Sequence, residues 1–194
     1  HQLTQLFQPN TRRWLSQYGW QLPPLVEAEA RCRLAAWTNA APDWRGEVLP
    51  TLALLGRLQS GPCSFRQAPA LATDGTFTLI DGYWYLPRLT VHRPEGTLEL
   101  GYVEDDFSNE YRWQVRSAID PRALRPLLSP RQQKALADFT FRDPPRVQGQ
   151  LWGRWRHLEQ TAFVAEIAAT NLVYRGENIS ELQGGLAFTN RLLT

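Results

Sequence analysis

The feature that most constrains this chain is an internal repeat, in which the residues from Leu6 onward align with those from Leu127 onward at a shift of 121 positions. The matched positions of the first copy are Leu6, Pro9, Leu15, Tyr18, Trp20, Pro23, Pro24, Val26 and Arg33. Those of the second copy are Leu127, Pro130, Leu136, Phe139, Phe141, Pro144, Pro145, Val147 and Arg154. Two segments with the same order of apolar, aromatic and proline residues are expected to form the same supersecondary unit, with its apolar face completed by its neighbour.

Further along the chain the shift falls to 109 positions. The pairs that define it are Phe65-Arg66 with Tyr174-Arg175, Gly75 with Gly184, and Asp81 with Asn190. The missing residues fall between Trp37 and Thr51, a stretch rich in Asn, Pro, Asp and Gly that predicts a longer loop in the first copy. We therefore predict a first unit over residues 1–121 and a truncated second unit over 122–194.

Each unit is predicted to begin with a helix, over residues 3–18 in the first and 122–139 in the second. Pro9 and Pro130 suit a first helical turn, and Ser129 is a good N-cap. Gln132 or Gln133 lies close to the position of a capping box. A Pro-Pro pair then stops each helix.

Strands are predicted after each Pro-Pro pair, within residues 25–119 and 146–194. Apolar and charged residues alternate from Val26 to Leu34, which is typical of a half-buried strand. A meander follows, and Asp81-Gly82 is its strongest hairpin signal. Its strands are expected at Thr76–Ile80, Tyr83–His92, Thr97–Tyr102 and Glu110–Ile119. The predicted fold class is mainly β with short helices: a long antiparallel meander sheet built from a tandem helix-plus-strands repeat.

Alternation in these strands also predicts one apolar sheet face. Its candidate members are Val26, Ala28, Ala30, Leu34, Phe77, Leu79, Leu89, Val91, Leu98, Leu100, Trp113 and Val115. Such a face must be covered by helices, by a second sheet or by lipid. One short helix per unit cannot cover all of it.

Composition limits the classes of partner. A formal net charge of +2 with scattered arginines excludes the basic patch of a nucleic-acid binder. The longest apolar run, from Leu49 to Gly56, is too short to span a bilayer.

We interpret Cys32 and Cys63 as two small buried thiols, with a single disulfide between them as the alternative. The absence of methionine and the uncapped end at Thr194 lead us to expect a piece of a longer protein with more copies of the unit.

No common catalytic motif occurs in the sequence, so we predict no catalytic, cofactor-binding or metal-binding residue. The three histidines, His1, His92 and His157, are far apart and are interpreted as surface residues. The acidic cluster consists of Glu104, Asp105, Asp106 and Glu110. It could bind calcium or divide acid and base roles, but a solvated hairpin loop explains it better.

The segment from Ala169 to Leu193, which includes Leu-Val-Tyr-Arg-Gly-Glu-Asn and Gln-Gly-Gly-Leu-Ala-Phe-Thr-Asn, resembles the AsmA-like proteins, relatives of TamB, of Gram-negative envelopes. Residues 64–82 look like a diverged copy of the same element. The resemblance implies a long curved β-sheet with an apolar groove, in the periplasmic part of a protein anchored in the inner membrane. It also implies a part in moving phospholipid to the outer membrane. The helix at the head of each unit and the abundance of tryptophan depart from the family pattern.

We therefore expect a non-catalytic structural segment whose apolar face contacts phospholipid or other acyl chains. Any attachment to the membrane would come only from parts of the parent chain outside this sequence. The alternative is an extracytoplasmic module that binds a protein or a glycan through surface aromatic residues. The residues it would use are Tyr83, Trp84, Trp152 and Trp155.

Overall fold

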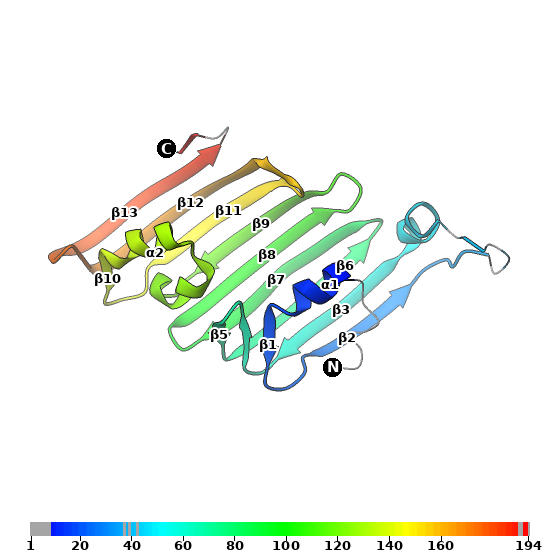
Figure 1. Ribbon diagram of the computed structural model, residues 1–194, viewed down its shortest axis with the longest axis horizontal. Helices are drawn as coiled ribbons and strands as arrows, with labels where there is room; N and C mark the ends of the chain where they lie inside the picture. Colours follow the sequence, from blue (N-terminus) through cyan, green and yellow to red (C-terminus); the bar gives the residue numbers. More distant parts are fainter. Residues whose placement is uncertain (1–8, 37, 39, 42, 190–191, 194) are drawn as a thin grey trace.

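The computed structural model describes residues 9–36, 38, 40–41, 43–189 and 192–193, and one long antiparallel sheet dominates it (Figure 1). Ten strands follow one another in the order β14-β13-β12-β11-β9-β8-β7-β6-β3-β2, and β10 pairs with β12 beside this path. In chain order the strands of this sheet are β2 (Leu25–Arg31), β3 (Ala53–Ser60), β6 (Ala72–Ile80), β7 (Tyr83–Arg93), β8 (Gly96–Asp105), β9 (Glu110–Ser117), β10 (Phe139–Phe141), β11 (Arg146–Arg154), β12 (His157–Tyr174), β13 (Glu177–Thr189) and β14 (Leu192–Leu193). The predicted fold class, mainly β with a large antiparallel sheet and few short helices, is confirmed.

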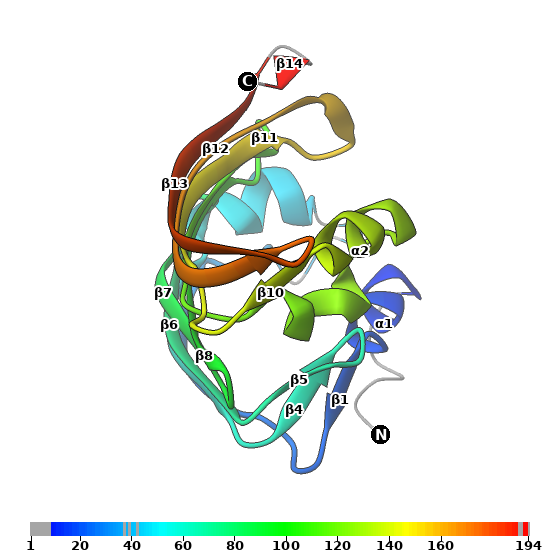
Figure 2. The same cartoon turned by 90° about the vertical axis from the view of Figure 1, so that its left-hand side faces the viewer.

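The remaining elements lie mostly on one side of this sheet, which curves around them (Figure 2). They are the helices α1 (Pro9–Leu15) and α2 (Pro130–Ala137), the 3-10 helix η4 (Pro121–Leu127) and a small sheet of β1 (Tyr18–Trp20), β4 (Cys63–Phe65) and β5 (Ala68–Ala70). We call the sheet face beneath them the inner face and the opposite one the outer face. Two short helical turns, η2 (Trp44–Val48) and η3 (Leu49–Thr51), lie in the long connection between β2 and β3.

The two halves of the chain make the same kind of corner. In the first half β1 pairs with β4, so that Tyr18 faces Phe65. In the second half β10 pairs with the end of β12, so that Phe139 faces Tyr174. These pairs occupy matching positions in the internal alignment, and in both corners the aromatic rings pack with centroids 4.8 Å apart.

In each corner, the aromatic residue on the second strand, Phe65 or Tyr174, is followed by an arginine that closes the corner. The main-chain N–H of Arg66 donates to the carbonyl of Gln17, and that of Arg175 donates to the carbonyl of Asp138. Each guanidinium also donates to the side chain of the same partner. Each lies about equally far from the preceding ring, at 5.3 and 5.2 Å. Both arginines have positive φ, so the chain reverses at the same point in both halves.

The helices are shorter than predicted. The first part of the predicted 3–18 helix lies outside the described residues, and α1 ends at Leu15. The predicted 122–139 helix is split into η4 and α2. The split is local in origin, because η4 contains Pro126 and ends at Leu127, and Ser129 caps a new helix that begins at Pro130. Gln132, not its neighbour, completes the capping box with Ser129.

The strand predicted from Val26 to Leu34 differs from expectation in length and burial. It ends at Arg31, so Leu34 lies outside the strand and is exposed. All seven residues of β2 are exposed, and the prediction of a half-buried strand is wrong. The reason is position: β2 is the edge of the sheet, pairs only with β3, and is not covered by the overlying elements (Figure 1).

The meander follows the predicted turns closely. Asp81 and Gly82 both have positive φ, which is the conformation that a type I′ hairpin requires. Pro87 lies in the middle of β7, where a proline would normally break a ladder. It is tolerated because the register shifts between Leu86 and Leu89, forming an irregularity opposite Gly101.

The molecule has little closed core. Its accessible surface is 14185 Å², whereas a compact monomer of its mass would expose about 9,400 Å². Among the described residues the buried hydrophobic side chains are Val48, Ala68, Leu79, Tyr111, Ile119, Ala162, Ala169 and Leu172. A single open sheet layer with a partial cover explains both observations.

Candidate functional site

The inner face of the large sheet is the candidate functional surface. Cross-strand partners point to the same side of a sheet, so the registers assign every strand residue to a face. The pair Leu89 and Leu100 continues to Val115 on β9 and then to Gly149 on β11. Of the twelve predicted residues, eleven lie on this face: Val26, Ala28, Ala30, Phe77, Leu79, Leu89, Val91, Leu98, Leu100, Trp113 and Val115. Leu34 does not, because the strand ends before it.

The same face continues through the second half of the chain. None of the twelve residues predicted for this face lies in that half. Its further members are Val147, Leu151, Phe163, Ala165, Ile167, Leu186 and Phe188. Phe163 and Phe188 stack across β12 and β13 with centroids 5.8 Å apart. The signal was available in the sequence, since residues 146–154 and 161–168 alternate in the same way as β7 and β8.

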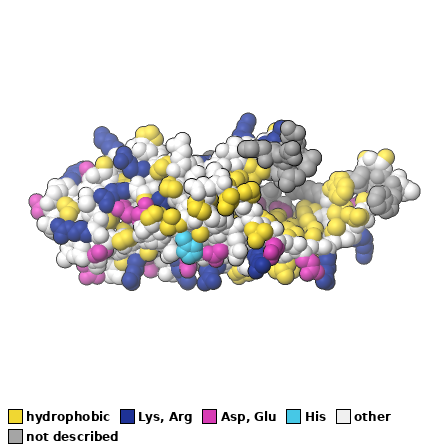
Figure 3. All heavy atoms as spheres, turned by 90° about the horizontal axis from the view of Figure 1, so that it is seen from below, with side chains coloured by type: hydrophobic (Ala, Val, Ile, Leu, Met, Phe, Trp, Pro, Cys, Tyr) yellow, Lys and Arg dark blue, Asp and Glu magenta, His cyan; other side chains and the backbone are white. Residues whose placement is uncertain are grey.

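The inner face is covered only in part. Leu79 is 2% exposed and Tyr111 is 8% exposed, but Leu89, Leu100 and Val115 keep intermediate exposure. Towards the β2 edge the cover ends and Val26 is 53% exposed. Seen from below, hydrophobic side chains form a band along the molecule, with charged side chains along the lower, outer edge (Figure 3). The inner face is therefore apolar, wide and accessible at its margins.

The outer face is mostly polar and solvated, although Leu55, Ile80, Tyr83, Tyr85 and Val103 are also exposed on it. Arg57 pairs with Glu27 there at 2.6 Å, and His92 lies 3.0 Å from Asp74. All four side chains are substantially exposed. Exposed ion pairs of this kind contribute little stability.

Arg93 anchors two of the overlying elements, β5 and η4, to the sheet. It lies at the end of β7, its side chain is 4% exposed, and it donates to Glu95 at 3.1 Å. Its two terminal nitrogens donate to the carbonyls of Pro69 in β5 and Ala123 in η4, at 2.5 and 3.1 Å. Burial opposes ionisation of Glu95, but hydrogen bonds that include the one from Arg93 outweigh it and lower the pKa of Glu95. One side chain thus holds both β5 and η4 against one end of the strands.

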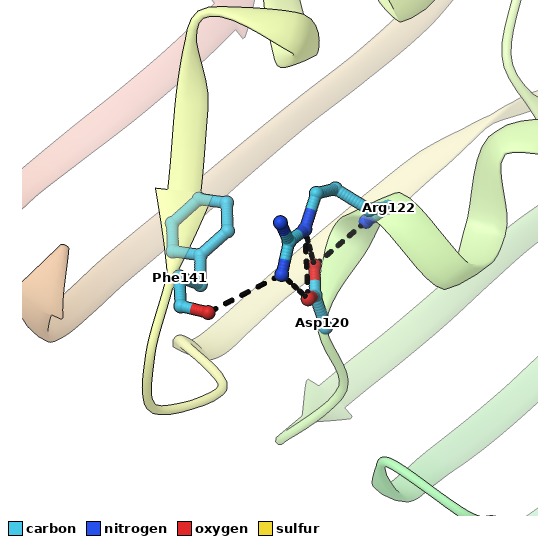
Figure 4. Close-up of polar contacts among 3 residues, drawn as sticks. All are labelled: Asp120, Arg122 and Phe141. Atoms are coloured by element: carbon cyan, nitrogen blue, oxygen red, sulfur yellow. Dashed lines mark hydrogen bonds and ion pairs between the residues drawn. The ribbon is translucent and has the colours of Figure 1, made fainter. Parts of the chain in front are cut away.

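A second polar cluster fixes η4 relative to β10. The carboxylate of Asp120 accepts from the main-chain N–H of Arg122 at 2.9 Å and pairs with its guanidinium at 2.5 Å (Figure 4). The same guanidinium donates to the carbonyl of Phe141 at 3.3 Å. Burial raises the cost of ionising Asp120, but the hydrogen bonds from Arg122 outweigh it, so the pKa of Asp120 is lowered.

At the other end of the strands, aromatic residues and carboxylates meet on the inner face. The Tyr102 hydroxyl donates to Glu104, and the Trp84 indole donates to Asp106 at 3.1 Å. Tyr102 also packs on Trp113 with centroids 4.2 Å apart. Burial is the main cause that raises the pKa of both Tyr102 and Glu104. This end of the inner face is therefore amphipathic, whereas its middle is aliphatic.

The acidic cluster divides between the two faces and the hairpin turn. Glu104 faces inward, whereas Asp105 lies opposite Glu110 in the strand register, at the end of the β8–β9 ladder and on the outer face. The main-chain N–H of Phe107 donates to Asp105, which lowers the pKa of that carboxyl. Among the described residues no group of three or more His, Cys, Asp or Glu side chains could hold a metal ion. The described histidines, His92 and His157, each lie beside one carboxylate on the surface; His1 lies outside the described residues.

The four aromatics of the alternative hypothesis do not form one surface. Trp84 points inward with Glu104, whereas Tyr83 pairs with Asp105 on the outer face. Trp152 also lies on the outer face, but on β11, with β8 and β9 between it and β7. Trp155 lies in the turn after β11 and packs on Tyr111.

The two cysteines are free. Cys63 has intermediate exposure, but Cys32 is exposed, so the interpretation of two buried thiols is wrong for Cys32. It lies just beyond the end of the exposed β2 strand. The alternative of a disulfide between them is not what the structure contains.

No described helix combines the length and the apolar character needed to cross a membrane. Comparison of the chain with protein-family models, curated proteins and solved structures gives no match.

Proposed function

We propose that this chain is a non-catalytic structural segment of an AsmA-like envelope protein, whose inner sheet face contacts the acyl chains of phospholipid. In this proposal it belongs to the periplasmic part of an inner-membrane-anchored protein and contributes to lipid transport or outer-membrane maintenance. The family and the location derive from the sequence resemblance alone.

The observation that supports acyl-chain contact is the mismatch between apolar surface and cover. The molecule exposes about half as much surface again as a compact protein of its mass. Much of its apolar residue content lines a single face that is only partly covered. Apolar surface costs about 25 cal/mol per Å² when left in water, so a face of this size favours an apolar occupant.

The polar outer face agrees with this arrangement. A sheet that buried both faces would show continuous apolar strands, whereas here alternate residues are charged or amide-bearing. The outer side of these strands is therefore less suited to hydrocarbon than the inner side.

The test places a photo-reactive side chain on each face of the same strand. Benzoylphenylalanine is introduced at Leu100, which faces inward, and in a matched variant at Glu99, which faces outward. The protein is irradiated with vesicles of phosphatidylethanolamine and phosphatidylglycerol and analysed by mass spectrometry. We expect lipid adducts with the probe at position 100 and few with the probe at position 99.

A second matched pair tests the face without a probe. Gly184 lies opposite Ile167 on the inner face, and Gly185 lies opposite Glu166 on the outer face. An added Cβ atom at either position meets nothing closer than 3.9 Å. Gly184→Asp should reduce the lipid recovered with the purified protein, and Gly185→Asp should not. Equal adducts from positions 99 and 100, or protein free of acyl chains in both assays, would refute lipid contact.

A further inference from the structure

The outer face has a hollow that the lipid-contact proposal does not use. Two adjoining depressions of about 740 and 640 Å³ lie over β9, β11, β12 and β13. They share Arg116, Gln148, Glu166 and Gly185. Together they form one elongated trough that runs along the strands, which we call the outer trough.

The side chains around the outer trough are polar and available. The long ones are Glu99, Gln114, Arg116, Arg146, Gln148, Gln150, Glu166 and Gln183. Within the described part of the chain none of these eight side chains takes part in a hydrogen bond or an ion pair. Elsewhere on the same face arginine and histidine pair with carboxylates, as in Arg57 with Glu27. The trough therefore presents donors and acceptors that the fold does not use.

The floor of the trough is made of small residues. Ala168, Ala187 and Gly185 contribute almost no side-chain height, and Val164 adds a low apolar patch. Gly185 is not in the left-handed region and a Cβ there would meet only the Ala165 carbonyl, at 3.9 Å. Neither backbone conformation nor packing requires a glycine at this place. A strand glycine of this kind is typical of a position that another molecule approaches closely.

Charge and hydrogen-bonding chemistry select the class of ligand. The two arginines and two glutamates around the trough cancel, so no net field favours a charged polymer. Two arginines beside two carboxylates are a poor match for nucleic acid. Amide side chains both donate and accept, which suits hydroxyl and acetamido groups. An added protein strand cannot pair here, because the main chain of these strands is already used in the sheet ladder.

A stacking surface lies at one end of the trough. Trp152 is on the outer face of β11, two residues beyond Gln150, and Ala162 directly opposite it is only 8% exposed. The indole retains intermediate exposure. An aromatic face beside a row of amides is the usual combination for a sugar ring.

We propose that the outer trough binds an uncharged glycan chain, which lies along β11 with one ring on Trp152. This site is independent of the inner face, and neither requires the other.

The test measures binding of the N-acetylglucosamine hexamer and of cellohexaose by isothermal titration calorimetry. We expect at least one of these neutral chains to bind with a Kd below about 1 mM. Gly185→Phe, at a position where an added Cβ meets nothing closer than 3.9 Å, places a ring in the trough and should weaken binding about tenfold or more. Trp152→Ala should weaken it to a similar extent. Circular dichroism confirms that each variant is folded.

The matched control is Gly184→Phe, on the neighbouring residue but on the inner face. It should leave glycan binding unchanged, and Gly184→Asp should reduce lipid recovery without changing glycan binding, so failure of one proposal is distinguishable from failure of the other. The glycan proposal is overturned if neither neutral hexamer binds, if Gly185→Phe binds as tightly as the parent protein, or if a galacturonic acid hexamer binds equally well.

Discussion

The Asp120 carboxylate both caps a helix and takes part in a contact between two elements. It caps η4 by accepting from the Arg122 main chain, and through the Arg122 guanidinium it reaches the Phe141 carbonyl in β10. Its pKa is lowered in the folded state. Stability from such a group is present above the pKa of the unfolded chain and is lost as pH falls through the folded value.

We therefore expect Asp120→Ala to lower the free energy of unfolding by about 1–2 kcal/mol at pH 7. Asp120→Asn should cost less, because an amide oxygen still caps the helix. Both losses should shrink as pH falls below the pKa of Asp120, since the parent protein then loses the same charge. Urea unfolding at pH 7 and pH 2.5 measures this, with Glu166→Ala as the control because the Glu166 side chain has no hydrogen-bond or ion-pair partner among the described residues. A loss that stays constant with pH would contradict the assignment.

At the scale of elements, the short pieces over the inner face are held mainly by specific polar contacts. β5 is joined to β7 where the Leu71 N–H donates to the His92 carbonyl, and both β5 and η4 receive hydrogen bonds from Arg93. Elements of only three to eight residues bury too little surface to dock by packing alone. Their positions therefore depend on a few buried donors.

Arg93→Met should lower the free energy of unfolding by roughly 2–4 kcal/mol, because it leaves two carbonyls without their donor and Glu95 without its partner. Hydrogen exchange should also become faster in β5 and η4 than in β8. Arg88→Met on the exposed outer face of the same strand is the matched control and should have little effect. If exchange rises equally throughout the sheet, Arg93 is not a local anchor.

At the scale of the whole molecule, the fold is one curved layer with a partial second layer (Figure 2). Both lateral edges are incompletely paired: β2 pairs on one side only, and β14 covers only Phe188 and Thr189 of β13. Such a shape exposes more surface and extends further than a globule of equal length.

Small-angle X-ray scattering should accordingly give a radius of gyration clearly above the roughly 16 Å expected for a compact domain of this length. The same measurement with bound phospholipid should leave the maximum dimension nearly unchanged, because the occupant lies within the curve of the sheet. A radius near the compact value would mean that the cover closes over the inner face in solution.

The features that could be predicted from the amino-acid sequence are those that depend on residues close together in the chain. The two-residue alternation assigned Leu89, Val91, Leu98 and Leu100 to one face, and Asp81-Gly82 specified its hairpin. These signals are local, because a strand's period and a turn's φ angles act over a few residues.

The location of the buried residues, in contrast, follows from the folded arrangement of the strands. The pattern of β2 reads as a half-buried strand, yet its position at the sheet edge leaves it exposed. The anchoring role of Arg93 and the joining of Gln148, Glu166 and Gly185 into one trough are also invisible in the sequence. Each depends on which distant segments become neighbours, and cross-strand pairing, not local preference, sets that.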